Sequence, residues 1–244
     1  MGKCQETVFR VFDIILIRMQ PSQIQCIGFI MDGNRRWAHE NNVPALAGHR
    51  RGREVMSDCV RWVRDAGIPH AVFYAFSTEN WLRKKTEVDG LLQLFTQVLQ
   101  ELLAEVDEDK VRIRIVGRRA DFAPELQSLM SAVEKKSESY SKTTIWIALS
   151  YGGRAEIIEA VNMAVAKGEP VTEDSFAALL QTAHMPDPDL IVRTGGEQRL
   201  SNFATWKSVY SELVFIDTHW PALTKSDFKD ILTTYESRER RKGV

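Results

Sequence analysis

The sequence predicts an α/β fold, a single domain built on a central, mostly parallel six-stranded sheet with surrounding helices. Short apolar runs alternate with stretches of helical periodicity, which is typical of parallel strands joined by crossover helices. Polar loops follow four of these apolar runs. The 244 residues contain no internal repeat, low-complexity segment or linker that would divide a core of this size.

Strands are expected where apolar runs are too short to form a helix. The first run, residues 27–31, is expected to be a buried parallel strand. The third run has Arg112 and Arg114 at alternate positions, so one of its faces is expected to be less buried. The other strands are expected at residues 71–76, 111–116, 144–149, 189–192 and 213–215.

Helices are expected between these strands. Residues 48–66 have apolar side chains at helical spacing, and Gly67 ends the helix as glycine commonly does. The longest helix has a wide apolar face that includes Val88, Leu91 and Phe95 and continues to residue 103. Ordinary core packing explains most of this face. Further helices are expected at residues 124–140, 156–166, 176–180 and 227–235.

The N-terminal segment is treated as a unit of its own. Residues 1–22 are expected to form an amphipathic helix, and residues 23–244 form the remaining domain. The segment contains Arg10 and Asp13, so its apolar run is neither a membrane span nor a signal peptide. We expect this helix to pack on its own domain, and peripheral contact with a membrane surface is the alternative.

The charge balance excludes a general nucleic-acid-binding protein. Lys and Arg number 32 against 33 Asp and Glu, which gives a net charge of −1, whereas nucleic-acid binders are distinctly basic. The three cysteines, Cys4, Cys26 and Cys59, form neither a CxxC pair nor a metal-binding spacing. They are compatible with a reducing cytosol, so we expect a cytoplasmic protein.

The loop that follows the first strand is the first candidate site. Asp32 is a hard oxygen ligand of the kind that Mg²⁺ prefers, and Gly33 allows a sharp turn. Asn34 can cap the helix that follows, while Arg35 and Arg36 carry charges suited to phosphate. A carboxylate beside two arginines indicates a metal-bridged diphosphate. A surface turn with solvated arginines is the equal alternative.

The four polar loops are expected to converge, because ligands of open parallel sheets bind outside the carboxyl ends of the strands. Neither a P-loop motif nor a G-x-S-x-G elbow occurs in the sequence, so nucleotide binding by a P-loop is excluded and a serine hydrolase is disfavoured. His49 lies close in sequence to the first loop, and both a structural and a functional role stay open for it. The expected group comprises Asp32, Glu212, Ser77, Asn80, Ser201, Arg35, Arg36, Arg83, Arg193 and Arg199.

Seven motifs in a fixed order carry a resemblance to a known family. They are MDGNRRWA, GHRRG, FSTENWLR, SYGGR, DPDLIVRTGGEQRLSNF, YSEL and WP. This set resembles that of the cis-prenyltransferases, the undecaprenyl diphosphate synthase and dehydrodolichyl diphosphate synthase family. The resemblance covers nearly the whole chain, from about residue 24 to the C-terminus.

The resemblance implies a transferase that condenses isopentenyl diphosphate with an allylic diphosphate such as farnesyl diphosphate. The product would be a cis polyprenyl diphosphate, a precursor of a lipid carrier. Asp32 would bind Mg²⁺ and assist departure of the allylic diphosphate, Asn80 would accept a proton, and Glu212 would be a second Mg²⁺ ligand. The implied substrate-binding residues are Gly33, Asn34, Arg35, Arg36, Trp37, His49, Ser77, Thr78, Glu79, Trp81, Arg83, Arg193, Arg199, Leu200 and Ser201.

The resemblance also implies an apolar tunnel and a homodimer. The tunnel for the growing chain would be lined by Ala75, Val88, Leu91 and Phe95. In family dimers the C-terminal tail reaches the neighbouring subunit, and here that tail contains Arg241 and Gly243.

Three positions depart from the usual family pattern. Cys26 stands where a histidine is usual, Ala45 where many members have an arginine for the allylic diphosphate, and Lys84 where a proline is common. The alternatives are a non-catalytic partner subunit and a diphosphate-binding phosphatase. The intact Asp32 and Asn80 argue against the first, and the lack of a clear water-activating base argues against the second.

Overall fold

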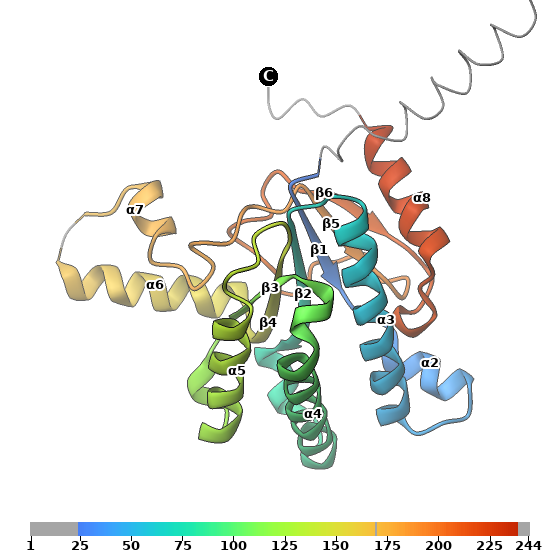
Figure 1. Cartoon of the computed structure of the whole chain (residues 1–244). Helices are drawn as coiled ribbons and strands as arrows, with labels where there is room; N and C mark the ends of the chain where they lie inside the picture. Colours follow the sequence, from blue (N-terminus) through green and yellow to red (C-terminus); the bar gives the residue numbers. More distant parts are fainter. Residues whose placement is uncertain (1–23, 169, 239–244) are drawn as a thin grey trace, which may run out of the picture.

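A computed structural model describes residues 24–168 and 170–238 of the chain (Figure 1). Six strands form one sheet in the order β3-β4-β2-β1-β5-β6, and each neighbouring pair is parallel. This arrangement confirms the predicted α/β fold. The strands are β1 Cys26–Ile30, β2 His70–Ser77, β3 Arg112–Val116, β4 Thr144–Tyr151, β5 Leu190–Arg193 and β6 Glu212–Phe215.

Helices and single 3₁₀ turns connect the strands. The α-helices of the described residues are α2 Asn34–Glu40, α3 Ala45–Asp65, α4 Lys85–Asp109, α5 Pro124–Lys136, α6 Gly153–Lys167, α7 Glu173–Ala177 and α8 Lys225–Glu236. The 3₁₀ turns are η1 Thr78–Leu82, η2 Arg119–Asp121 and η3 Trp220–Ala222.

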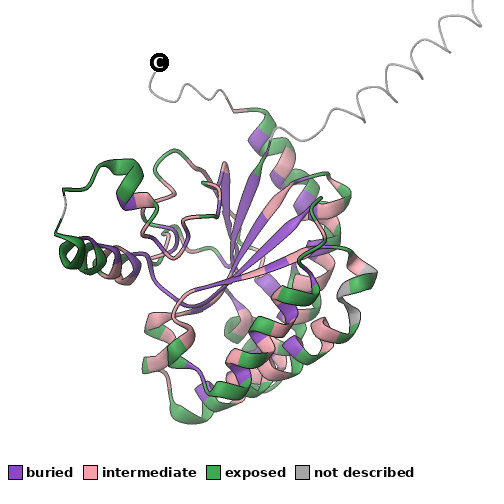
Figure 2. Ribbon diagram, turned by 60° about the vertical axis from the view of Figure 1, so that its left-hand side comes forward, coloured by how far each residue is buried: buried purple, intermediate pink, exposed green. Residues whose placement is uncertain are grey.

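Alternate residues of the strands supply two hydrophobic cores. On one face of the sheet, Phe29 of β1 stacks on Phe73 of β2 with ring centroids 5.1 Å apart. The helices α3, α4, α5 and α8 cover this face and bury their apolar stripes against it. The buried strands form the centre of the molecule in Figure 2.

The opposite face is covered mainly by irregular chain between β5 and β6. Phe203 packs there against Cys26 and Ile30 of β1. The approach is close because Gly28 has no side chain, and a Cβ at that position would lie 2.9 Å from the Phe203 ring. This segment also contains several of the predicted site residues, so packing and site geometry are coupled.

The first loop departs from the prediction in one respect. Gly33, and not Asn34, is the N-cap of α2, with a φ of 100° that glycine adopts without strain. Asn34 is the first helical residue, and its side-chain amide donates to the carbonyl oxygen of Met31 at 2.9 Å. The predicted capping role of Asn34 is therefore wrong, because this side chain turns back toward the preceding strand.

Most predicted helices are present, with shifted ends. The helix predicted from residue 48 begins at Ala45, directly after Pro44, and the one predicted from residue 156 begins at Gly153. The helix predicted at residues 176–180 is instead α7, which starts at Glu173 and is capped by Thr172. A capping box between Thr172 and Ser175 explains this earlier start.

Two predictions concern the ends of the chain. The amphipathic helix at residues 1–22 and the tail with Arg241 and Gly243 both lie outside the described residues. The domain division at residue 22 therefore stays a prediction. Within residues 24–168 and 170–238, none of the helices combines the length and the apolar character that a bilayer crossing requires.

Candidate functional site

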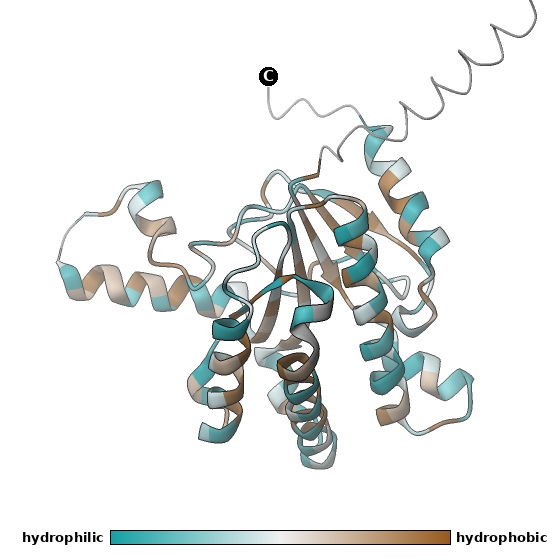
Figure 3. Cartoon of the chain, viewed as in Figure 1, coloured by the Kyte–Doolittle hydropathy of each residue, from teal (hydrophilic) through white to brown (hydrophobic). Residues whose placement is uncertain are grey.

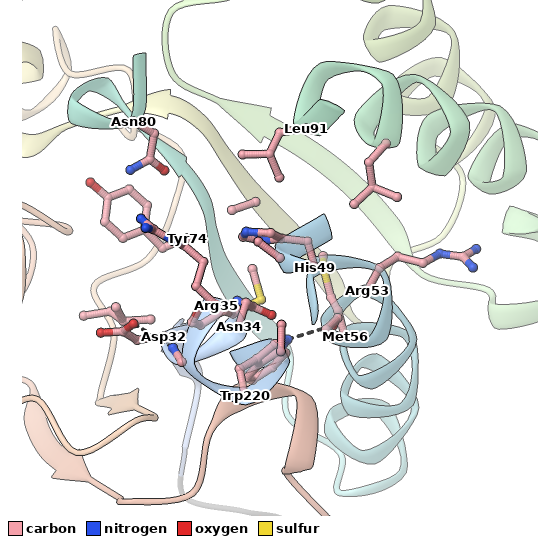
Figure 4. A pocket seen from close by; sticks show the side chains of 18 of the residues that line it. Asp32, Asn34, Arg35, His49, Arg53, Met56, Tyr74, Asn80, Leu91 and Trp220 are labelled. Carbon is pink, nitrogen blue, oxygen red and sulfur yellow. Dashed lines mark hydrogen bonds between the residues drawn. The ribbon is translucent and has the colours of Figure 1, made fainter. Parts of the chain in front are cut away.

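A cavity of about 880 Å³ opens at the carboxyl ends of the strands, between the sheet and helices α2, α3 and α4 (Figure 4). One part is polar and is lined by residues of α2 and of the loops after β1, β2 and β5. The other part is apolar. Its wall is formed by Met56, Leu91, Leu94, Phe95, Val98, Leu99, Ile147 and Leu149. The cavity thus has a charged end and an apolar end, and it can hold one elongated ligand that has both a charged and an apolar part.

Asp32 lies at the polar end in a network of cations. Its Oδ2 accepts from Nη2 of Arg193 at 2.8 Å, and its Oδ1 accepts from the Gly33 backbone N–H at 2.6 Å. Nη2 of Arg36 lies 3.2 Å from Oδ1. Partial burial raises the pKa of Asp32, but the hydrogen bonds and the two arginine charges outweigh it and hold the pKa below its usual value. Asp32 is therefore a carboxylate.

Arg193 is the most buried cation of the site, with 3% of its surface exposed. Its guanidinium also donates to the Ser201 hydroxyl at 2.7 Å and to the backbone carbonyl of Arg199. Its Nε is buried and has no hydrogen-bond partner among the described residues. A buried, partly unsatisfied cation beside the cavity favours an anionic ligand.

Two glycines of α3 set the position of α2. A Cβ on Gly48 would lie 2.1 Å from the backbone oxygen of Asn34, and one on Gly52 would lie 2.2 Å from its side-chain Oδ1. The GHRRG motif thus provides a flat surface against which the start of α2 packs. This contact directs Arg35 and Arg36 to the cavity, where both line the wall.

His49 also lines the cavity, and it is neutral at physiological pH. Burial, together with the charges of Arg83 and Arg35, outweighs the opposing effect of Glu87 and lowers the pKa of His49 to about 4. Its Nε2 is buried with no hydrogen-bond partner among the described residues. The neutral imidazole can therefore donate or accept a hydrogen bond at Nε2 when a ligand binds, and it adds no charge to the site.

The second loop places Ser77, Asn80 and Arg83 on the cavity wall. The Ser77 backbone N–H donates to Oδ1 of Asn80 at 3.2 Å, which fixes the amide. Trp81 does not line the cavity. Its indole N–H donates to Ser150 Oγ at 2.8 Å, so this residue holds the loop in place.

Thr78 and Glu79 likewise connect loops and do not face the cavity. Asn202 donates from Nδ2 to Oε1 of Glu79 at 2.8 Å. A Cβ on Gly152 would lie 2.5 Å from Thr78 Oγ1, and one on Gly153 would lie 2.3 Å from Thr205 Oγ1. The two glycines of the SYGGR motif therefore allow the second loop and the loop after β5 to approach each other closely.

Several predicted residues lie away from the cavity wall, namely Trp37, Val88, Arg199, Leu200 and Glu212. The Arg199 side chain is exposed and pairs with Glu197. Glu212 begins β6, in register with Leu190, whereas Arg193 at the other end of β5 is the residue beside Asp32. Glu212 pairs with Arg238 at 2.8 Å and does not meet Asp32 within one chain. Its role as a metal ligand stays a prediction.

The donor set fits magnesium in one specific way. No cluster of three His, Cys, Asp or Glu side chains able to hold a metal occurs in residues 24–168 and 170–238. Mg²⁺ does not require such a cluster, because it is commonly held by one or two carboxylates together with substrate phosphates and water. The Asp32 side chain is 31% exposed and can supply that carboxylate.

The structure adds residues that sequence reasoning missed. Tyr74 lines the cavity from β2, and its hydroxyl donates to the Tyr151 carbonyl at 3.2 Å. Trp220 lines the cavity from η3 and donates from its indole to the Gly52 carbonyl at 2.7 Å. The WP motif pointed to Trp220 but not to its role. Arg53 of α3 is a third such residue.

Comparisons with known proteins show the family to which the chain belongs. A family described as "Putative undecaprenyl diphosphate synthase" matches residues 30–243. An isoprenyl transferase of Thermotoga maritima is 42% identical over 224 residues, which is 90% of this chain and 96% of the relative. An isoprenyl transferase of Aquifex pyrophilus is 40% identical over 89% of this chain and 94% of the relative.

Solved structures share the fold as well. The crystal structure of lavandulyl diphosphate synthase from Lavandula x intermedia in complex with dimethylallyl diphosphate has a TM-score of 0.88, 28% identity, and coverage of 92% of this chain and 100% of that chain. A probable undecaprenyl diphosphate synthase from Campylobacter jejuni has a TM-score of 0.78, 31% identity, and coverage of 91% and 99%. The family match over most of the chain shows that this protein is a prenyltransferase of the undecaprenyl diphosphate synthase family.

Proposed function

We propose that this prenyltransferase condenses isopentenyl diphosphate units with an allylic prenyl diphosphate, such as farnesyl diphosphate, in the cis configuration to give a polyprenyl diphosphate. The observation that carries the proposal is the position of Asp32. It lies between two arginine side chains at the charged end of a cavity whose other end is apolar. One cavity can therefore hold a diphosphate and a growing hydrocarbon chain.

The polar residues of the cavity are assigned to two separate diphosphate groups, one from each substrate. Arg35, Arg36 and His49 line the wall beside α2 and are assigned to the allylic diphosphate. Arg193 and Ser201 are hydrogen-bonded to each other on the β5 side and are assigned to isopentenyl diphosphate. Charge-assisted hydrogen bonds from arginine suit phosphate oxygens in both places.

The reaction breaks the allylic carbon–oxygen bond and forms a carbon–carbon bond to isopentenyl diphosphate. Inorganic diphosphate leaves with the bonding electron pair, and one proton is then lost from the isopentenyl unit. Bound Mg²⁺ would be held by Asp32 and would neutralise the charge that develops on the leaving diphosphate. Fixed arginines add to this stabilisation without reorganising during the reaction. Asn80, whose Oδ1 has a second lone pair, is the proposed proton acceptor.

We also propose a homodimer whose interface includes α6. This helix extends away from the sheet in Figure 1, and Figure 3 shows apolar segments along it. Ile158, Val161 and Val165 are exposed and lie on one face, since they are three and four residues apart. An exposed apolar stripe of this kind marks an interaction site. Replacing Ile158 with Asp should convert a dimer to a monomer in light scattering, and a wild-type monomer would contradict the proposal.

We propose a cytoplasmic location because the described cysteines are free thiols. Cys26 and Cys59 are buried and free, with no disulfide in the described part of the chain. Whether residues 1–22 contact a membrane stays a prediction.

The proposed reaction is tested by incubating the protein with farnesyl diphosphate, labelled isopentenyl diphosphate and Mg²⁺. We expect a series of labelled polyprenyl diphosphates by mass spectrometry, with cis double bonds by NMR. A protein that binds both diphosphates but forms no carbon–carbon bond would instead be a non-catalytic subunit.

A further inference from the structure

Helices α3 and α4 form the outer wall of the apolar part of the cavity. Both begin near the cavity mouth, at Ala45 and Lys85 respectively, and run along the same face of the sheet (Figure 1). Met56 lines the cavity from α3, and Leu91 and Leu99 line it from α4. The line along which these two helices meet is therefore the side wall beside which a growing hydrocarbon chain would lie.

Arg53 is an unexpected residue in this wall. The other arginines and carboxylates that line the cavity belong to α2, to the end of β5, or to segments that follow β1 and η1. Arg53 instead lies on α3 between Gly52 and Met56, among apolar neighbours of the cavity. In Figure 4 its stem starts at the cavity and its guanidinium points away from it. There the guanidinium pairs with Glu101 of α4.

This ion pair joins the two helices part of the way along the line where they meet. Nearer the mouth, Gly90 of α4 lies against Leu46 of α3. At the far end, Nη1 of Arg64 lies 3.4 Å from Oδ1 of Asp109. With a rise of about 1.5 Å per helical residue, Arg53 lies roughly 10 Å beyond Leu46 and roughly 16 Å before Arg64.

The Arg53–Glu101 ion pair contributes little to the stability of the contact between the two helices. The Arg53 and Glu101 side chains are 34% and 45% exposed, and ion pairs so close to solvent contribute little to stability. A hydrocarbon chain, in contrast, gains stability with every carbon that it buries. The intact pair therefore closes the wall by a small margin, and loss of either charge is enough to let a longer chain bury further carbons between the helices.

We propose that the Arg53–Glu101 ion pair is a gate in the cavity wall that sets the length at which chain growth ends. The inference rests on the proposed function and makes these two side chains specificity-determining residues of that reaction. With the gate closed, the ion pair holds α3 and α4 together and the chain end has no path between them. With the gate open, the chain passes between α3 and α4 and elongation continues.

The test measures the product lengths of single and paired variants by mass spectrometry, from farnesyl diphosphate and labelled isopentenyl diphosphate. Arg53→Met keeps an apolar stem and removes the charge, while Arg53→Glu places two carboxylates across the same contact. Both should shift the main product upward by at least one isoprene unit. The charge swap Arg53→Glu with Glu101→Arg should return the wild-type lengths, since it restores the attraction.

Arg51 provides a matched control. It pairs with Glu54 on the same helix and does not line the cavity, so Arg51→Met should give wild-type lengths. Unchanged or shorter products in both Arg53 variants would overturn the gate. The gate would also be overturned if the charge-swapped protein did not fold or did not make products of wild-type length. A wild-type protein that incorporates no isopentenyl diphosphate overturns the proposed function and the gate together. Incorporation with unchanged lengths overturns the gate alone.

Discussion

Arg193 donates from Nη2 to Oδ2 of Asp32 at 2.8 Å, and this contact joins the end of β5 to the loop after β1. The arginine side chain is 4% exposed, so the aspartate is held by a cation that water hardly reaches. Thr194 adds a hydrogen bond from its hydroxyl to the backbone carbonyl of Asp32 at 2.7 Å, which fixes the main chain of the loop. The carboxylate is thus fixed in position before any ligand binds, which is the preorganisation that electrostatic catalysis requires.

The first prediction concerns His49 and pH. Its pKa is lowered to about 4, whereas the unfolded imidazole titrates near its ordinary value of about 6.5. Between these values the unfolded chain binds a proton that the folded protein does not bind. The free energy of unfolding should therefore fall as the pH is lowered through this window, by on the order of 3 kcal/mol in total.

Urea unfolding of wild type and His49→Gln at a series of pH values checks this expectation. The variant should lose that part of the pH dependence, because glutamine does not titrate. His184 is exposed, so His184→Gln serves as the control and should keep the wild-type profile. Equal pH dependence in wild type and His49→Gln would contradict a buried neutral imidazole.

The second prediction concerns the fit between α2 and α3. Gly48→Ala would place a Cβ 2.1 Å from the Asn34 backbone oxygen, which cannot move without shifting α2. We expect a loss of about 1–3 kcal/mol in the free energy of unfolding, as for overpacked cores. Gly90→Ala in α4 meets only Leu46 carbons at 3.6 Å and should be neutral or stabilise by up to about 1 kcal/mol. Similar unfolding curves for the two variants would show that the close approach is unimportant.

The third prediction concerns Ala45, where many family members have an arginine. Ala45 and Arg35 both line the cavity, so Arg35 is positioned to replace the missing charge. Arg35→Gly should raise the KM for the allylic primer about ten- to a hundredfold, the value of one charge-assisted hydrogen bond. The KM for isopentenyl diphosphate should change little.

Adding Ala45→Arg to the Arg35→Gly variant should partly restore primer affinity. Steady-state kinetics with each substrate varied in turn measures both effects. If Arg35→Gly leaves the primer KM unchanged, or if the second change gives no recovery, Arg35 is only a solvated surface charge.

Strand direction explains why much of the site was predictable. Asp32, Ser77 and Arg193 each stand at the carboxyl end of an apolar run, and parallel strands bring those ends together. The same rule shows where the prediction for Glu212 is weak. That residue begins the sixth strand, so it lies at the amino ends of the strands, where it pairs with Arg238.

Other features needed side-chain geometry. Motif membership did not distinguish Asn80, which lines the cavity, from Trp81, which supports the loop through Ser150. Arg53 gave no signal, because a polar residue on an amphipathic helix is expected to face solvent. Its position on the wall follows from how α3 and α4 meet, and sequence periodicity does not contain that information.

The central claim is that the charge of Asp32 drives departure of the allylic diphosphate, and Asp32→Asn tests it most directly. The substitution keeps the shape of the side chain and removes its charge. Incorporation of labelled isopentenyl diphosphate onto farnesyl diphosphate at saturating Mg²⁺ is the measurement. Asp89→Asn, at an exposed pair on α4, is the control and should retain wild-type turnover. The account predicts a loss of about 10²–10³ in kcat for Asp32→Asn in a folded protein, and near-wild-type turnover in that variant would contradict it.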